Sequence, residues 1–457
     1  MVRTRIAPSP TGDPHLGTVY TALFNYAFAK KNKGEFILRI EDTDRTRIVP
    51  EAEQKIIDSL SWLGLKWDKG PYRQSERLAL YQKTAKELVE SGAAYYCDCS
   101  SDRLAEVRKK QQAKREIPRY DRKCRVNPPK KGKFVVRLRV PADGDTNFED
   151  LIRGNITFKN RDIDDAVLLK SDGWPTYHLA VVVDDISMKI SHVIRAEEWL
   201  SSTPKHILIY QALKNKPPIY AHLPLLRNQD KSKISKRKNP VSLVWYRNQG
   251  YLPQAILNYL ALMGWSMPDG REKFSLEEFI DKIDLSRVDP VGPIFDLQKL
   301  NWLNGQWSRS ISDKELISKI KETSKYAEPD IKKVLPLVWE RVKVLSEFDE
   351  LVKFVFESPR VDNTLLLSFG YTAAETKEVL KKVLVKYENL VWEQKRLEEG
   401  TRKLAVQIGW KPADLFMTIR VVICGSKESP PLFESLIVVG KDESIKRLDR
   451  AVDSLTN

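Results

Sequence analysis

The first hundred residues alternate short apolar runs with a segment of helical periodicity. Residues 2–7 and 36–40 predict strands because they are short apolar runs bounded by turn-forming or charged residues. The segment between them predicts a helix whose apolar face is formed by Val19, Leu23, Phe24, Ala27 and Phe28. Strands that alternate with helices in this way are typical of a parallel sheet.

Charged residues follow the predicted strands. Acidic residues occupy positions 41, 42 and 44, directly after the second strand. Residues 179–183, Leu-Ala-Val-Val-Val, predict a third strand that runs into Asp184 and Asp185. Residues 191–194 predict a fourth, which runs into Arg195. Because open α/β sheets bind ligands at the carboxyl ends of their strands, we expect these charges to gather at one site.

Two other parts of the chain have a different pattern. Residues 98–172 lose the regular alternation and contain a charged helix at 103–115 and a strand at 134–140, so we interpret them as an inserted module. Beyond residue 240 the strand signals fade and amphipathic helices are predicted, notably within 334–355 and 375–397. The chain therefore ends in helical domains.

Composition limits the class of protein. With 457 residues the chain is too long for one compact core. No run of eighteen apolar residues occurs, and the N-terminus lacks the apolar core of a signal peptide, so we expect a cytoplasmic protein without a membrane partner. A net charge of +15 favours a polyanionic partner, although a basic solvated surface explains the charge equally well.

Residues 14–18, Pro-His-Leu-Gly-Thr, lie where the first strand gives way to a helix. A helix N-terminus presents unpaired backbone amides and the positive end of the helix dipole, which suits phosphate. Gly17 would permit close approach of a nucleotide, and His15 could donate to a phosphate oxygen. Taken alone, a loop histidine and a turn glycine are more often structural.

Residues 231–238 carry five cations in eight positions, separated by small hydroxyl residues. One interpretation is a solvated basic loop. The other is an electrostatic clamp that neutralises a triphosphate during displacement at phosphorus. The residues alone leave both open.

Together these two segments resemble the paired signatures of class I aminoacyl-tRNA synthetases. They occur here as HLGT at residues 15–18 and KISKR at 233–237. Four further motifs are similar to hallmarks of the glutamyl and glutaminyl enzymes: RIAPSPTG at 5–12, RIEDTD at 39–44, PTYHL at 175–179 and IRAEEW at 194–199. The chain is identified as a member of the bacterial-type glutamyl branch, whose C-terminal part is helical where related enzymes have β-barrels.

The resemblance implies a role for each matching residue. Glutamate would be bound by Arg5, Ala7, Ser9, Glu41, Tyr177 and Arg195. ATP would be bound by His15, Gly17, Glu198 and Lys236, and catalysis would depend on His15, Gly17, Lys233 and Lys236, with Mg²⁺ accompanying ATP. Chemistry agrees, because glutamate offers two carboxylates for guanidinium groups and one ammonium for a carboxylate. In isolation, Arg5 or Glu41 would be better explained by a surface ion pair.

The resemblance also implies a fold and a domain order. We expect an α/β chain with a Rossmann-type parallel-sheet catalytic domain at 1–97 and 173–240, interrupted by an α+β acceptor-end-binding module at 98–172. A helical stem-contact domain at 241–312 and a helical anticodon-binding domain at 313–457 would follow.

The implied reaction joins L-glutamate to the 3′ end of tRNA(Glu) with ATP, in a monomeric ligase. Three questions stay open at this point. tRNA(Gln) is a second candidate acceptor. A glutamyl-queuosine-type paralogue and an inert synthetase-like RNA-binding protein are alternative identities.

Three cysteines, Cys97, Cys99 and Cys124, match three ligands of a zinc site that some glutamyl-tRNA synthetases carry. Structural zinc normally has four protein ligands. The position where the family would place the fourth is Val126, which cannot coordinate. We therefore expect a lost site without zinc.

Overall fold

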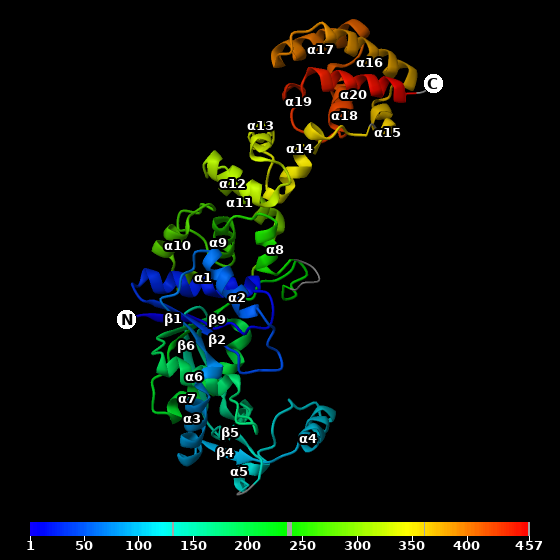
Figure 1. Cartoon of the computed structure of the whole chain (residues 1–457). Coiled ribbons are helices and arrows are strands. Elements are labelled where there is room, and N and C mark those ends of the chain that lie inside the picture. Colours follow the sequence, from blue (N-terminus) through cyan, green and yellow to red (C-terminus); the bar gives the residue numbers. More distant parts are fainter. Residues whose placement is uncertain (130–131, 235–239, 361, 456–457) are drawn as a thin grey trace. The chain divides into compact units, whose positions relative to one another are not determined.

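A computed structural model describes residues 1–129, 132–234, 240–360 and 362–455, and the chain divides into two compact units (Figure 1). The first unit comprises Met1–Tyr246 and Pro253–Leu297. The second comprises Arg247–Leu252 and Gln298–Asn457. Each unit packs around apolar side chains of its own.

The strands of the first unit form three groups. One group pairs in parallel and consists of β1 (Arg3–Ile6), β2 (Glu35–Ile40) and β3 (Lys69–Arg73). In the second, β9 (His192–Ala196), β10 (Ile219–Leu223) and β6 (Asp145–Asp150) pair in parallel, and β7 (Gly154–Lys159) adds an antiparallel edge. The third is an antiparallel sheet of β4 (Ala94–Cys97), β5 (Val135–Leu138) and β8 (Val167–Leu169).

The first two groups meet where β1 and β9 lie side by side (Figure 1). The amide of Ser191 donates to the carbonyl of Arg3 at 3.0 Å, and the amide of Arg3 donates to Oγ of Ser191 at 2.7 Å. This junction brings the carboxyl ends of β1, β2 and β9 to a common edge, where the sequence places its charged motifs.

The helices of the first unit are α1 (Leu16–Lys31), α2 (Ala52–Trp62), α3 (Leu78–Glu90), α4 (Ser101–Ala113), α5 (Lys123–Val126), α6 (Tyr177–Ser187), α7 (Thr203–Ala212), α8 (Leu243–Asn248), α9 (Pro253–Leu262) and α10 (Leu276–Lys282). Several of them pack against these sheets, whereas α4 buries none of its residues and projects away from the strands (Figure 1). The predicted helix after β1 is confirmed as α1, which packs against β1 and β9 and buries Val19, Leu23, Phe24 and Ala27.

The predicted strands at 2–7, 36–40, 134–140 and 191–194 are confirmed as β1, β2, β5 and β9. The strand predicted at 179–183 is wrong, because these residues form the middle of α6. All five side chains there are buried, and a continuous apolar run fits a buried helix as well as a buried strand. The helix places Tyr177 at its first turn and Asp184 and Asp185 in its last.

The second unit is helical, as predicted, and no strand follows Leu223 in the part of the chain that the structure describes. Its helices are α11 (Leu297–Ser308), α12 (Asp313–Thr323), α13 (Glu328–Val338), α14 (Phe348–Phe356), α15 (Asn363–Leu366), α16 (Ala373–Glu388), α17 (Gln394–Ile408), α18 (Pro412–Cys424), α19 (Leu432–Val439) and α20 (Lys441–Ser454). Among the described residues, no helix combines the length and apolar character needed to cross a bilayer.

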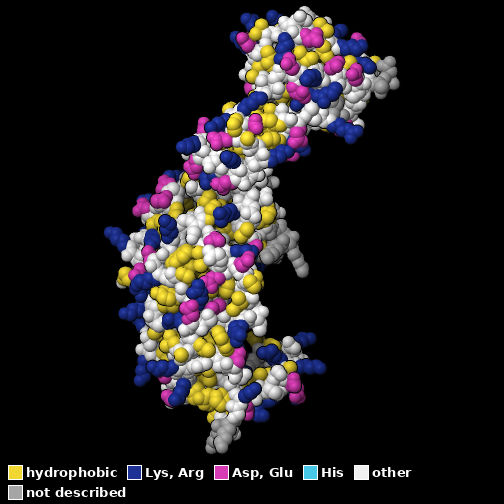
Figure 2. Space-filling view, viewed as in Figure 1, with side chains coloured by type: hydrophobic (Ala, Val, Ile, Leu, Met, Phe, Trp, Pro, Cys, Tyr) yellow, Lys and Arg dark blue, Asp and Glu magenta, His cyan; other side chains and the backbone are white. Residues whose placement is uncertain are grey.

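The positive charge of the chain is dispersed on the face shown in Figure 2. Lysine and arginine side chains are scattered there among acidic and apolar ones rather than gathered into one patch. Net charge therefore does not locate a functional site, whereas the carboxyl edge of the sheet does.

Candidate active site

A cavity of about 820 Å³ lies in the first unit at the carboxyl ends of β1, β2 and β9. Its lining includes every residue predicted to bind glutamate or ATP or to act in catalysis that the structure describes: Arg5, Ala7, Ser9, His15, Gly17, Glu41, Tyr177, Arg195, Glu198 and Lys233. Lys236 lies outside the described residues. The fold thus brings together residues that are separated by more than two hundred positions in sequence.

The N-terminus of α1 forms one wall of the cavity. His15 is the N-cap residue, and its Nδ1 accepts a hydrogen bond from the amide of Gly17 at 3.0 Å. A Cβ at position 17 would lie 3.3 Å from that nitrogen, closer than an ordinary contact, so glycine permits the cap. With Nδ1 accepting, a neutral ring carries its proton on Nε2 and can donate there. Amide, dipole and imidazole together suit a phosphate.

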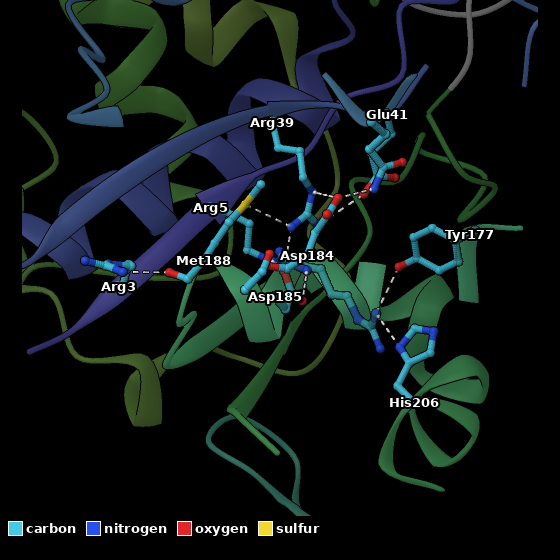
Figure 3. Close-up of polar contacts among 12 residues, drawn as sticks. Arg3, Arg5, Arg39, Glu41, Tyr177, Asp184, Asp185, Met188 and His206 are labelled. Carbon is cyan, nitrogen blue, oxygen red and sulfur yellow. Dashed lines mark hydrogen bonds and ion pairs between the residues drawn. The ribbon is translucent and has the colours of Figure 1, made fainter. Parts of the chain in front are cut away.

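On the side of β1 and β2, arginines and carboxylates compensate one another (Figure 3). Arg39 is fully buried and lies 2.7 Å from Asp185, 3.3 Å from Glu41 and 3.8 Å from Asp184, measured between guanidinium nitrogens and carboxylate oxygens. Arg5 Nε lies 3.2 Å from the same Asp185. We name these five residues the paired cluster.

The charges of the paired cluster alter the pKa values of its carboxylates. Burial alone would raise the pKa of Asp185, but Arg5 and Arg39 outweigh it and hold that pKa below its usual value. For Glu41 burial dominates and raises the pKa, although Arg39 and Arg5 oppose it. Asp185 therefore stays ionised and serves the structure, whereas Glu41 lines the cavity and its carboxylate is not fully compensated.

On the side of β9 the guanidinium of Arg195 has a different environment. It donates from Nη1 to the Tyr177 hydroxyl at 2.9 Å and from Nη2 to Thr203 Oγ1 at 2.8 Å. Nη1 also lies 3.3 Å from His206 Nδ1, and Nε donates to His222 Nε2 at 3.1 Å. No carboxylate among the described residues lies within 4.0 Å of this guanidinium, although Arg195 is only 5% exposed. A buried cation without a counter-ion suits an anionic ligand.

The predicted clamp segment reaches the cavity through Lys233. Its Nζ lies 2.5 Å from Oε2 of Glu198, which follows β9. Both side chains are about half exposed, so the ion pair itself contributes little to stability. It does connect the segment to the part of the cavity wall that follows β9.

Comparison with known proteins agrees with this arrangement. The family described as tRNA synthetases class I (E and Q), catalytic domain, matches residues 1–302, and the family described as anticodon binding domain matches residues 312–452. A glutamate–tRNA ligase from Acidothermus cellulolyticus is 47% identical over 98% of this chain and 95% of its own length. This chain belongs to the glutamyl-tRNA synthetases of class I.

Two further relatives support this membership of the glutamyl-tRNA synthetase family. A glutamate–tRNA ligase from Dehalococcoides mccartyi is 44% identical over the whole of this chain and 98% of its own length. The crystal structure of a glutamate tRNA ligase from Elizabethkingia meningosepticum, in complex with its amino acid, superposes with a TM-score of 0.87 at 32% identity and full coverage of both chains. The predicted fold class, a Rossmann-type parallel sheet followed by helical domains, is thereby confirmed.

The cysteines form a separate thiol cluster. The Sγ atoms of Cys97, Cys99 and Cys124 all lie within 4.8 Å of one another. The hydroxyl of Tyr120 lies 3.4 Å from the sulfurs of both Cys97 and Cys99. Val126 is 81% exposed. Three sulfurs and the Tyr120 oxygen therefore lie together as four candidate donors, so the valine at position 126 no longer argues against zinc, and zinc binding itself stays a prediction.

Several residues that shape the cavity or the thiol cluster could not be assigned a role from the sequence. Asp184 and Asp185 were noted only as charges, and Arg39 only as the first letter of a motif. For His206, His222 and Tyr120 no local pattern exists, because each meets its partners through tertiary contacts. The one available signal was rarity, since the whole chain has only five histidines.

Proposed function

We propose that this chain is a glutamate–tRNA ligase that activates L-glutamate with ATP and transfers it to the 3′ end of tRNA(Glu). The observation that carries the proposal is the uncompensated, buried Arg195 in the same cavity as the α1 N-terminus. One feature suits a carboxylate and the other a phosphate, and an aminoacyl-adenylate contains both chemistries. The names of relatives 44–47% identical over nearly the full length support the choice of amino acid.

For glutamate, we assign one carboxylate to Arg195 and Tyr177. The Tyr177 hydroxyl accepts from Arg195, and no described residue accepts its hydrogen, so it can donate to a carboxylate oxygen. We assign the ammonium to Glu41, whose position at the cavity wall offers an incompletely compensated carboxylate. Arg5, Ala7 and Ser9, which end β1 and begin the next turn, complete this subsite.

For ATP, we assign the phosphates to His15, Gly17 and the first amides of α1, and the adenosine side to Glu198. Lys233 would exchange its pairing with Glu198 for a phosphate, and Lys236 would act beside it. A divalent metal accompanies ATP in this class of enzyme, and we propose that it is Mg²⁺. The metal would neutralise phosphate charge, while the residues of this chain position the reactants.

The reaction then needs no enzymic nucleophile. A substrate carboxylate oxygen attacks the α-phosphorus, the bond to the bridging oxygen breaks, and pyrophosphate leaves with its electron pair. A terminal ribose hydroxyl of the tRNA next attacks the activated carbonyl carbon, loses its proton, and releases AMP. Alignment and charge stabilisation supply the catalysis.

The two alternative identities are less well supported. A glutamyl-queuosine-type paralogue would lack a C-terminal anticodon-binding domain, and such a domain matches residues 312–452 here. An inert synthetase-like RNA-binding protein would tolerate loss of the site residues, whereas all those described line one cavity. A monomeric enzyme that acts in the cytoplasm remains the prediction made from the sequence.

The test is aminoacylation of purified tRNA(Glu) and tRNA(Gln) with radiolabelled glutamate. We expect acid-precipitable label on tRNA(Glu) that depends on ATP, and label on tRNA(Gln) would extend the acceptor set. Folded protein that labels neither RNA contradicts the proposal. As a control, glutamine in place of glutamate should give no charging.

A further inference from the structure

Two of the five histidines of the chain contact Arg195 and a third contacts one of these two, and the three come from different elements. His206 lies on α7, His222 on β10 and His178 in the first turn of α6. His206 Nδ1 lies 3.3 Å from Arg195 Nη1, and His222 Nε2 lies 3.1 Å from Arg195 Nε. Figure 3 shows His206 and Tyr177 on the same side of the site, away from the paired cluster. His178 belongs to the PTYHL motif, whereas His206 and His222 lie outside the motifs that define the family resemblance.

The hydrogen-bond pattern determines where the protons lie. A guanidinium group only donates, so the histidine nitrogens that face it must accept and carry no proton. The other nitrogen of each ring then has an acceptor of its own. His206 Nε2 lies 3.2 Å from His178 Nδ1, and His222 Nδ1 lies 2.6 Å from Oδ2 of Asp150. His206 is therefore the Nε2–H tautomer and His222 the Nδ1–H tautomer, and both are neutral.

Burial acts in the same direction. It lowers the pKa of His206 well below its usual value, and the positive charge of Arg195 adds to the effect. Burial, Lys205 and Arg195 lower the pKa of His178 to about 4. For His222 burial also prevails and lowers the pKa, although Asp150 opposes it. These rings stay uncharged at neutral pH.

The neutral partners distinguish Arg195 from the other buried arginines of the cavity. Arg5 and Arg39 share the carboxylate of Asp185, at 3.2 and 2.7 Å, and Arg39 also faces two further carboxylates, so their charges are offset. Arg195 is surrounded by two imidazoles, two hydroxyls and, at 3.4 Å, the carbonyl of Trp199. Asp150 is separated from it by the ring of His222. The orientation of the Arg195 guanidinium is thus determined as completely as that of Arg39, but its positive charge is not neutralised.

We propose that His206 and His222 are positioning residues for substrate selection: as neutral acceptors they orient the Arg195 guanidinium without neutralising it, so that its charge is kept for a carboxylate of the substrate. This inference rests on the proposed binding of glutamate. Its chemical consequence is discrimination against glutamine, which has the same shape as glutamate but an uncharged amide in place of the side-chain carboxylate.

The sharpest test compares His206→Asn with His206→Asp. Both side chains place an oxygen near the position of Nδ1, where it can accept from Arg195, and they differ only in charge. We expect the KM for glutamate to be roughly 10- to 100-fold higher in H206D than in H206N, as for loss of a charge-assisted contact. The KM for ATP should stay the same in both. The assay is ATP–pyrophosphate exchange, run with tRNA present throughout.

A second readout is the ratio of glutamate to glutamine activation. This ratio should fall in H206D and be retained in H206N, because only the aspartate compensates Arg195. If His206 merely fills space, the two variants will show equal KM values and equal ratios, and that result overturns the inference. Wild-type protein that does not activate glutamate at all would instead refute the proposed function, so the two failures are distinguishable.

A direct measurement needs no variant. In the full chain labelled with ¹⁵N-histidine, the imidazole nitrogen shifts report tautomer and charge for each of the five rings. We expect His206 as Nε2–H and His222 as Nδ1–H, both unchanged from pH 6 to 8. An imidazolium at either position at pH 7 overturns the inference, even if H206D fails to fold.

Discussion

The two sides of the cavity accommodate a buried arginine in opposite ways. In the paired cluster, Arg39 is enclosed by Asp184, Asp185 and Glu41, so that its positive charge is offset by carboxylates of the protein. Around Arg195 every partner is neutral. The first arrangement serves the fold, because the charge of its buried arginine is already offset, and within it Glu41 keeps an incompletely compensated carboxylate at the cavity. The second arrangement leaves the positive charge of Arg195 available to a ligand, and burying that uncompensated charge destabilises the ligand-free protein.

The largest expected effect is on stability, from Arg39→Met. This change removes the cation shared by Asp184 and Asp185 and leaves them with Arg77 and Arg5, and breaking such a buried group costs about 3–5 kcal/mol in free energy of unfolding. Urea denaturation measures the loss. The matched control is Arg115→Met, an exposed position where the change should stay within about 0.5 kcal/mol. A loss below about 1 kcal/mol for R39M would mean that the cluster does not hold the fold.

Arg195→Met should show the reverse pattern. We expect kcat/KM for glutamate to fall by roughly 100-fold, equivalent to about 2.7 kcal/mol, because the substrate carboxylate loses its charged partner. The free energy of unfolding should stay the same or rise, since a buried cation without a counter-ion has been removed. Pyrophosphate exchange and urea denaturation of the same preparation check both parts. If R195M destabilises the protein as much as R39M does, the proposed difference between the two sides of the cavity is wrong.

The thiol cluster adds a third site to the comparison. It groups sulfur and oxygen atoms that could bind a cation, whereas Arg195 is itself a cation that could bind an anion. We expect protein purified without chelator to contain one zinc per chain, held by Cys97, Cys99, Cys124 and Tyr120. Tyr120→Phe should weaken zinc binding by at least roughly 10-fold, since even residues that only support a ligand contribute that much. The control is Tyr96→Phe, because Tyr96 lies in the same sheet as Cys97 but away from the sulfurs. Metal analysis that finds no zinc in the wild type contradicts this expectation.

A smaller effect is expected from acid. The pKa of Asp185 is lower in the folded protein than its usual value of about 3.9, so the stabilisation it provides is complete above that value. It is lost as the pH falls from there toward the lowered folded pKa. The difference in unfolding free energy between wild type and Asp185→Asn should therefore be constant from pH 7 to 5 and shrink below about 4. A difference that already declines near pH 6 would point to the histidines instead.

Much of this protein could be predicted from local pattern. The strands β1, β2, β5 and β9, the helix α1 and the helical C-terminal part follow from hydrophobic periodicity, which a short segment displays without its neighbours. The motifs also predicted which residues line the cavity, since backbone turns at strand ends carry them. The strand expected at 179–183 failed because periodicity disappears when every face of an element is buried.

The sequence by itself determined the family, the order of the elements and the residues that would meet at the carboxyl edge of the sheet. Only the tertiary structure decided which of the buried arginines is neutralised. Arg5, Arg39 and Arg195 look alike in sequence, because the charge of a side chain does not reveal what it will contact. The roles of Asp185, His206, His222 and Tyr120 depend on partners that lie from 11 to 180 residues away in the sequence. Electrostatic compensation is a property of distance in space, and folding creates those distances.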